Sequence, residues 1–302
     1  MASLTVKKKG DTVEGFRILD EIGRGAASII YLVQDPKSKQ IWALKHVMKL
    51  GPKDQRFLDQ AIAEYKIASQ VGHPAIRSID KVIKKGGPLN TKELFLVMEL
   101  VDGHALDSYH IETMGEAVEF FRQVAEGIHA MHAAGYVHAD MKPHNIIVGA
   151  DFDGNPTAKV IDLGQSCKIG TIKERIQGPP DYIAPEQLHR REITPVPDVY
   201  NLGATMYWVF TRQHIPTAMG HNADSLVGSL DDALIEKATP AIELNPNLHP
   251  RLSALIMHAV EVDPNKRPQS MREVADQLDL IGGIVRAQAA PADAAFDDDD
   301  AD

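Results

Sequence analysis

The chain has 302 residues, of which 44% are hydrophobic and 25% are charged, and this balance excludes a wholly disordered or fibrous protein. Acidic residues outnumber basic ones by 42 to 32, and the formal charge of −10 argues against nucleic acid as the main partner, because phosphate binding needs a basic surface. The single cysteine and the lack of an apolar run of about 20 residues argue against an internal disulfide and membrane insertion, and favour a cytoplasmic protein.

The first third of the chain is predicted to form mainly strands. Apolar runs cover 16–22, 29–35 and 41–47, and Gly-Arg-Gly and Asp-Pro-Lys-Ser separate them as turn signals. A helix is expected over about 54–71, followed by strands near 77–84 and 94–100. This part therefore indicates a small β-rich lobe with one main helix.

After residue 103 the pattern becomes helical. Two capping boxes, Thr113–Glu116 and Ser270–Glu273, precede apolar residues at helical spacing. Residues 199–210 are apolar on nearly every side, which predicts a helix buried within its lobe. An α+β architecture follows, with a strand-rich lobe before a larger helical lobe, and the cleft between the lobes is the expected place for a small ligand.

Six short motifs follow one another across these two lobes. The glycine pair Gly23 and Gly25, taken alone, is equally typical of an ordinary hairpin turn. After it come Lys45 at the end of Ile-Trp-Ala-Leu-Lys, Glu64 in a helix, His-Ala-Asp-Met-Lys-Pro-His-Asn at 138–145, Asp-Leu-Gly at 162–164 and Ala-Pro-Glu at 184–186. On these motifs the sequence resembles the eukaryotic-type Ser/Thr protein kinases over about 13–281.

The resemblance implies a bilobal protein-kinase-like fold and a division of the chain. The kinase domain would comprise an N-lobe at 13–98, a hinge at 99–103 and a C-lobe at 104–281. Residues 1–12 are expected to be a flexible lead-in. Residues 282–302 are expected to be a disordered acidic tail, because most of that segment lacks the apolar residues that a packed core needs.

The resemblance also implies ATP and Mg²⁺ as cofactors and assigns the catalytic and metal-binding groups. Asp140 would accept the proton of the substrate hydroxyl, and Lys142 would balance charge on the γ-phosphoryl group. Asn145 and Asp162 would ligate Mg²⁺, since both offer the hard oxygen donors that this ion prefers.

The phosphates of the nucleotide would lie against the N-lobe. Lys45 would hold the α- and β-phosphates, and Glu64 would fix Lys45 through an ion pair. Gly23 and Gly25 would let backbone N–H groups approach the phosphates, because glycine has no Cβ in the way. An isolated Lys or Glu is more often a solvated surface charge, but Lys45 ends an apolar strand.

The adenine would lie between the lobes. Met98 would stand behind the ring, and the backbone of Glu99 and Val101 would form hydrogen bonds with it. Four apolar side chains would enclose the ring, namely Ile22, Ile30, Ala43 and Ile147. The same residues also fit an ordinary strand core, and the two interpretations are compatible.

Other acidic and histidine residues are predicted to have supporting roles. Glu186 should pair with Arg267, and Asp198 should bind the backbone of the catalytic loop. The run Asp151–Asn155 faintly resembles the start of a calcium loop but lacks the closing glutamate, so a hairpin turn is favoured. His129 and His132 are interpreted as solvated or packing histidines and not as metal ligands.

Three positions depart from the family pattern. Ser28 replaces the third glycine of the phosphate loop, and Ala139 replaces the arginine that usually precedes the catalytic aspartate. Pro179 replaces a threonine and offers neither a hydroxyl nor an N–H. The change at Pro179 bears on turnover more than on nucleotide binding, whereas Ser28 is small enough to be tolerated in the loop.

The function that the resemblance implies is a serine/threonine protein kinase that transfers the γ-phosphoryl group of ATP to protein hydroxyls. Lys142, two residues after Asp140, is typical of Ser/Thr kinases and disfavours tyrosine specificity. The alternative is a nucleotide-binding signalling scaffold with little transfer activity. A small-molecule phosphotransferase is disfavoured, because Ala-Pro-Glu at 184–186 belongs to the peptide-docking segment of protein kinases.

Overall fold

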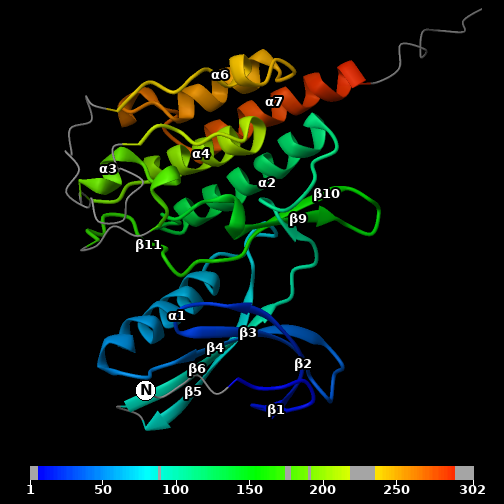
Figure 1. The fold of residues 1–302 in the computed structure, drawn as a ribbon, viewed down its shortest axis with the longest axis vertical. Helices are drawn as coiled ribbons and strands as arrows, with labels where there is room; N and C mark the ends of the chain where they lie inside the picture. The colour runs from blue at the N-terminus through cyan, green and yellow to red at the C-terminus, as the bar shows by residue number, and fades with distance from the viewer. Residues whose placement is uncertain (1–5, 88–89, 174–177, 190–191, 218–234, 290–302) are drawn as a thin grey trace, which may run out of the picture.

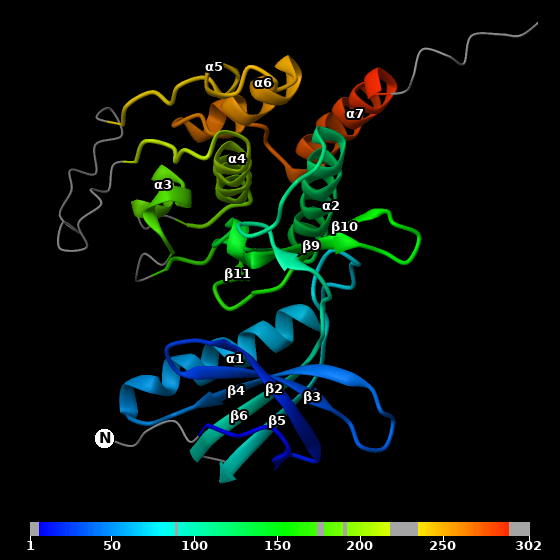
Figure 2. The same cartoon turned by 45° about the vertical axis from the view of Figure 1, so that its right-hand side comes forward.

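In the computed structural model, a small strand-rich lobe and a larger helical lobe are joined along one side (Figures 1 and 2). The structure describes residues 6–87, 90–173, 178–189, 192–217 and 235–289. The elements of the small lobe are β1 (Thr12–Val13), β2 (Phe16–Arg24), β3 (Ser28–Gln34), β4 (Ile41–Met48), α1 (Gln55–Ala68), β5 (Ile79–Gly87) and β6 (Asn90–Glu99). The predicted strands and the predicted helix of this lobe are confirmed.

The six strands of the small lobe form one antiparallel sheet in the order β1-β2-β3-β4-β6-β5. Alternate residues of each strand point to opposite faces. In β6, Leu94, Leu96 and Met98 pack toward the main core with α1, whereas Phe95 and Val97 belong to a second apolar cluster. Both faces of the sheet are therefore buried, and its central strands are held rigidly behind the cleft.

The segment before β2 is attached to this sheet, which differs from the prediction of a flexible lead-in over 1–12. The backbone N–H of Lys7 donates to the Tyr31 hydroxyl (3.1 Å), and that of Gly10 donates to the Ile18 carbonyl (2.9 Å). An ion pair between Glu14 and Lys85 joins this end of the sheet to β5. Polar composition does not reveal such contacts, because they are made mainly by the backbone. Residues 1–5 lie outside the described part.

In its described residues, the large lobe is built around four long helices. Its helices are α2 (Met114–Ala133), α3 (Pro185–Leu188), α4 (Val196–Thr211), α5 (Ala241–Leu244), α6 (Pro250–Ala259) and α7 (Met271–Ala289). The Thr113 hydroxyl accepts the backbone N–H of Glu116 (3.1 Å), and the Ser270 hydroxyl accepts that of Glu273 (3.2 Å), so both predicted caps are confirmed. Helix α4 is buried along most of its length, as predicted.

Short strands connect the large lobe to the cleft. They are β7 (His104–Ala105), β8 (Tyr136–Val137), β9 (Ile146–Ala150), β10 (Pro156–Val160) and β11 (Cys167–Lys168). Strands β10, β9 and β7 form a small antiparallel sheet under the hinge, and β11 pairs with β8. The run Asp151–Asn155 forms the β9–β10 turn, as favoured from the sequence: the Asp151 carboxylate accepts the backbone N–H groups of Asp153 (2.9 Å) and Asn155 (2.8 Å).

Helix α7 continues past the predicted end of the domain. It ends at Ala289, whereas the prediction placed a disordered tail from residue 282 onward. A Cβ added at Gly282 would lie 3.4 Å from Val118 of α2, and Val285 packs against the main core. The tail boundary at 282 was therefore wrong, because this extra stretch of helix buries apolar surface against α2. Residues 290–302 lie outside the described part. No helix in the described ranges is long and apolar enough to cross a membrane.

Candidate active site

The phosphate-loop glycines lie at the turn between β2 and β3. The backbone N–H of Gly25 donates to the Ser28 carbonyl (2.8 Å), and a Cβ at Gly25 would come within 2.8 Å of the Ser28 hydroxyl. A side chain at Gly25 would therefore force the Ser28 hydroxyl to rotate away from the turn. Gly23 pairs with Ile30 across the two strands.

Lys45 and Glu64 form the ion pair that the sequence predicted. Lys45 on β4 lies 2.6 Å from the Oε2 atom of Glu64 on α1, and the Glu64 side chain is 1% exposed. Arg77, which no motif indicated, lies 3.6 Å from the Oε1 atom of the same carboxylate, also within the buried interior. One carboxylate therefore faces two cations.

The charges in this cluster stabilise one another against burial. Burial opposes ionisation of Lys45, but Glu64 and Asp162 outweigh it and hold the pKa of Lys45 above its ordinary value. Burial also opposes ionisation of Asp162. The charge of Lys45, a hydrogen bond from the Gly164 N–H (2.9 Å) and the charge of Arg77 nevertheless lower the pKa of Asp162. Lys45 and Asp162 are therefore charged at neutral pH.

Asp140 lies on the opposite wall of the cleft, in the loop before β9. The Lys142 ammonium is 3.0 Å from its Oδ2 atom, and the Asn145 Nδ2 donates to its backbone carbonyl (2.8 Å). This last contact uses the amide nitrogen of Asn145. Its Oδ1 oxygen therefore remains available as a ligand for a cation. Asn145 and Asp162 thus supply two hard oxygen ligands, a set that suits Mg²⁺ when phosphates and water complete the shell.

One pocket of about 320 Å³ unites the charged residues of the two lobes. Lys45 and Glu64 line it from the small lobe, and Asp140, Lys142 and Asp162 line it from the large lobe. The turn after Gly25 and residues of α1 complete its wall. The structure thus brings together, around one cavity, five of the residues that the motifs singled out.

The residues expected around adenine are not among the described residues that line this pocket, and Val101 and Ile147 line a separate cavity of about 400 Å³. Ala43 on β4 pairs with Met98 on β6, and both side chains are buried. Ile22 is 49% exposed, whereas Ile147 lies on β9 under the hinge. The Glu99 carboxylate bonds to Lys159 and Ser78 behind the hinge, which holds this segment against β10.

Asp198 organises the backbone of the catalytic loop, as predicted. Its carboxylate accepts the N–H groups of His138 (2.8 Å) and Ala139 (2.7 Å), and it lies 2.8 Å from the His132 ring. Burial opposes ionisation of Asp198, but the contact with His132 and these hydrogen bonds lower its pKa. Its partner His132 is one of the two histidines that the sequence analysis interpreted as packing residues.

Ala139 stands where an arginine is usual, and its surroundings are apolar. It packs with Val137, Ile193 and Cys167 in a small cluster. Its backbone is in the left-handed region (φ 62°), which is unfavourable for residues with a Cβ. The space beside the catalytic loop is therefore filled by hydrocarbon and sulfur.

The segment after Asp162 is tied to the large lobe by its backbone. The Gly170 N–H donates to the Ile193 carbonyl (2.9 Å), and the Ile193 N–H donates to the Thr171 carbonyl (3.0 Å). Lys173 donates to the carbonyl of Gln165. Burial lowers the pKa of Lys173, although the nearby Cys167, Asp198 and Asp140 oppose this effect. These contacts order residues 165–173.

The end of this segment reaches the catalytic aspartate. Gly178 has a left-handed backbone (φ 114°), and a Cβ there would lie 2.8 Å from the Oδ1 atom of Asp140. Glycine is therefore needed next to Pro179 for two separate reasons. The basic residue Arg175, between Lys173 and Gly178, belongs to 174–177, which lie outside the described residues.

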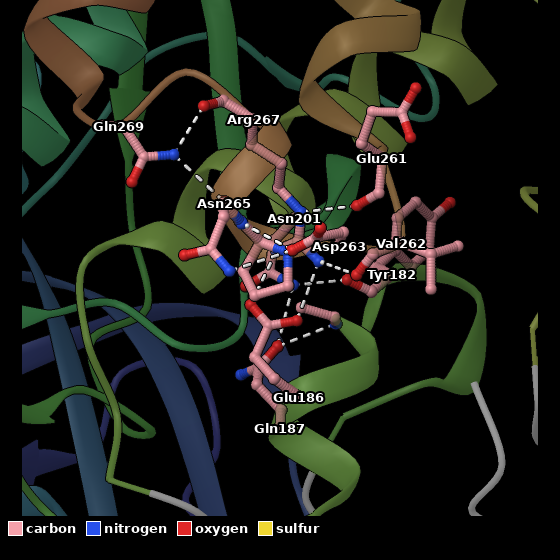
Figure 3. Close-up of polar contacts among 12 residues, drawn as sticks. Tyr182, Glu186, Gln187, Asn201, Glu261, Val262, Asp263, Asn265, Arg267 and Gln269 are labelled. Atoms are coloured by element: carbon pink, nitrogen blue, oxygen red, sulfur yellow. Dashed lines mark hydrogen bonds and ion pairs between the residues drawn. The ribbon is translucent and has the colours of Figure 1, made fainter. Parts of the chain in front are cut away.

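The predicted pair Glu186–Arg267 anchors this region to the large lobe (Figure 3). Two guanidinium nitrogens of Arg267 lie 2.6 and 2.8 Å from the two oxygens of Glu186, and Arg267 also donates to the Glu261 and Val262 carbonyls. Asn201 of α4 donates to the Tyr182 carbonyl and to the Gln187 side chain. The docking segment is thus held by a dense set of hydrogen bonds.

Comparison with known proteins gives consistent matches. Residues 16–278 match the family described as the protein kinase domain. The chain is 28% identical over 280 residues to the serine/threonine-protein kinase pkn2 of Myxococcus xanthus, covering 87% of this chain and 32% of that protein. It is 27% identical over 281 residues to the serine/threonine-protein kinase PknA of Mycobacterium tuberculosis, covering 90% of this chain and 62% of that protein. The chain therefore spans less than two thirds of the length of either relative.

Proposed function

The chain belongs to the protein kinase domain family, and from this premise we propose that it is a serine/threonine protein kinase. It transfers the γ-phosphoryl group of ATP to serine or threonine hydroxyls of protein substrates. Both relatives are named serine/threonine-protein kinases, which supports serine and threonine as the residues that accept the phosphoryl group. A cytoplasmic location, favoured by the single cysteine, is part of the same proposal.

The observation that carries the proposal is the pocket shared by the Lys45–Glu64 pair and Asp140. Phosphoryl transfer depends on positioning and on neutralising charge, and not on a covalent protein intermediate. Lys45 is held charged and in a fixed direction by Glu64, so its ammonium can bind phosphate oxygens. Ala26, Ala27 and Ser28, in the turn after Gly25, line the same cavity.

Asp140 then acts on the acceptor. Its carboxylate receives the proton of the substrate hydroxyl as the oxygen attacks the γ-phosphorus and the bond to the β-phosphate oxygen breaks. Lys142, 3.0 Å away, offsets negative charge on the transferring group. Mg²⁺, when bound by Asn145 and Asp162, supplies further neutralisation of the phosphates.

Adenine binding between Ile22, Ile30, Ala43 and Ile147, with Met98 behind the ring and the Glu99 and Val101 backbone at its edge, is part of the proposal. So is the division into a kinase domain with its hinge at 99–103. The buried Ala43–Met98 pair favours this assignment, because it places apolar side chains next to Lys45 on β4.

The direct test is a transfer assay with labelled ATP, Mg²⁺ and a generic protein substrate. We expect label on Ser or Thr of the substrate with wild-type protein and at least a 100-fold lower rate with Asp140→Asn. Equal label with both proteins would contradict the proposal. ATP binding without transfer by the wild type would instead favour a nucleotide-binding scaffold.

A further inference from the structure

Arg77 is a buried cation in the candidate active site that belongs to none of the sequence motifs. It lies between α1 and β5, and its backbone N–H donates to the Val160 carbonyl (2.9 Å), two residues before Asp162. Its side chain is 9% exposed. A guanidinium stays charged in proteins, so this position places a permanent positive charge inside the small lobe.

The charge of Arg77 is compensated by the carboxylates of the active site. Its Nη2 atom lies 3.6 Å from the Oε1 atom of Glu64, an ion-pair distance and longer than a hydrogen bond. Lys45 lies 2.6 Å from the other oxygen, Oε2. The carboxylates of Asp162 and Glu99 also attract the guanidinium.

The number of charges explains why a second cation matters. Without nucleotide, Lys45 alone would face two carboxylates, the buried one of Glu64 and the half-buried one of Asp162, and one negative charge would lack a partner. An unpaired buried charge is strongly unfavourable. With Arg77 present, two cations face two carboxylates, and the cluster is neutral before any ligand arrives.

We propose that Arg77 is a positioning residue for phosphoryl transfer, which holds the second oxygen of Glu64 and so keeps α1 docked against Lys45 before nucleotide binds. This inference rests on the proposed kinase function. Since Arg77 also places a positive charge near Asp162, it weakens the attraction of that carboxylate for Mg²⁺. The residue therefore favours a preassembled ion pair at the expense of metal affinity.

The first test is hydrogen exchange of α1 in the full chain without nucleotide or metal. In Arg77→Met, we expect the amides of 55–68 to exchange about tenfold faster than in wild type, because Glu64 loses one partner. Arg77→Lys keeps the charge and should restore most of the protection. Arg122→Met removes another partly buried guanidinium with two carboxylate partners, on α2 of the large lobe, and should leave exchange in α1 unchanged.

The second test separates positioning from a general loss of structure. A Mg²⁺ titration of binding to a fluorescent, non-hydrolysable ATP analogue should show half-saturation at about threefold lower Mg²⁺ in Arg77→Met. Its kcat should nevertheless fall about tenfold with KM for ATP changed less than threefold, because a misplaced Lys45 acts mainly on the chemical step. Simple destabilisation would weaken metal binding and turnover together.

Lys45→Met provides a readout with Arg77 intact, and so remains informative if Arg77→Met does not fold. We expect α1 in Lys45→Met to keep its protection, because Arg77 still holds Glu64, and we expect the double variant to lose it. The proposal is wrong if Lys45→Met alone deprotects α1 as fully as the double variant, or if Arg77→Met matches wild type in exchange and in Mg²⁺ titration. The hydrogen-exchange and Mg²⁺-titration readouts need no phosphoryl transfer, so they stand even if the kinase assay is negative.

Discussion

Two buried ion pairs of this protein differ in how completely their atoms are hydrogen-bonded. In the large lobe, Arg267 donates to both oxygens of Glu186 and to the Glu261 and Val262 carbonyls (Figure 3). Its guanidinium also lies 4.8 Å from the centre of the Tyr200 ring. In the cleft, Glu64 has one short contact, with Lys45.

The second oxygen of Glu64 is buried and has only the longer contact with Arg77. In the Glu186–Arg267 pair, both carboxylate oxygens are already hydrogen-bonded, so an exchange of partners would bring no gain, and the pair stabilises the fold. A pair with spare capacity, placed at the edge of a pocket, can exchange contacts when phosphates enter. From this comparison we expect the Glu186–Arg267 pair to act mainly on stability and the Lys45–Glu64 pair mainly on turnover.

The largest expected effect is on turnover, within the cleft. Asp140→Asn should reduce phosphoryl transfer by about 10²–10⁴-fold, because the carboxamide cannot accept the hydroxyl proton. Nucleotide affinity and the free energy of unfolding should change little, since Asp140 is bound to Lys142 at the surface of the pocket. Single-turnover transfer and calorimetric ATP binding measure the two quantities. A variant that loses nucleotide binding as severely as transfer would show that Asp140 acts in binding.

A change in the Glu186–Arg267 pair should affect the free energy of unfolding more than the rate of transfer. Arg267→Ala leaves the Glu186 carboxylate without its partner and should lower the free energy of unfolding by about 3–5 kcal/mol. Transfer per folded molecule should stay within about twofold of wild type. Urea unfolding followed by circular dichroism, with active-site titration of the folded fraction, tests both statements. Unchanged stability in Arg267→Ala would remove the distinction between the two pairs.

Asp198 extends the comparison to a carboxylate bound mainly by N–H groups. Its pKa is lowered in the folded protein, so its contribution to stability is present above the unfolded value of about 3.9 and is lost as the pH falls through the folded value. Asp198→Asn should therefore lower stability at pH 7 by about 1–3 kcal/mol and flatten its decline below pH 4. Unfolding free energies between pH 3 and 7 measure this. An identical acid decline in both proteins would mean that other carboxylates dominate it.

The smallest effect is expected from the segment after Asp162. Ala139 offers no charge to clamp a phosphate, and backbone contacts already order residues 165–173. The double change Ser166→Ala/Thr171→Ala should therefore reduce transfer to an external substrate less than tenfold, or about 1.4 kcal/mol. Phosphatase-treated wild type is the matched control. A larger loss would reveal a phosphate-dependent switch.

The sequence predicted the contacts that belong to spaced motifs. The pairs Lys45–Glu64 and Glu186–Arg267 and the role of Asp198 followed from residue type and order, and the structure confirms all three contacts. Arg77 was missed because an arginine in an irregular segment is usually exposed. Arg77 is buried here because the preceding residue, Ile76, forms a β-bridge with Val160, and this bridge holds the segment against the large lobe.

The boundaries of the domain were harder to predict than its centre. The glycine pair at 282–283 is typical of a helix end, yet α7 continues because Val285 finds apolar contacts on α2. Likewise, the order of residues 165–173 depends on backbone hydrogen bonds to Ile193, which leave no pattern in the local sequence. Both cases are decided by partners distant in the chain.

The apolar cluster around Ala139 also limits which sequences this protein can reach by single substitutions. Arginine at this position would have to place a long charged side chain among Val137, Ile193 and Cys167, while adopting a left-handed backbone. Smaller or more polar residues at Ile193 or Cys167 would have to come first. The loss of the arginine is therefore difficult to reverse, and descendants of this chain would retain a catalytic loop without that residue.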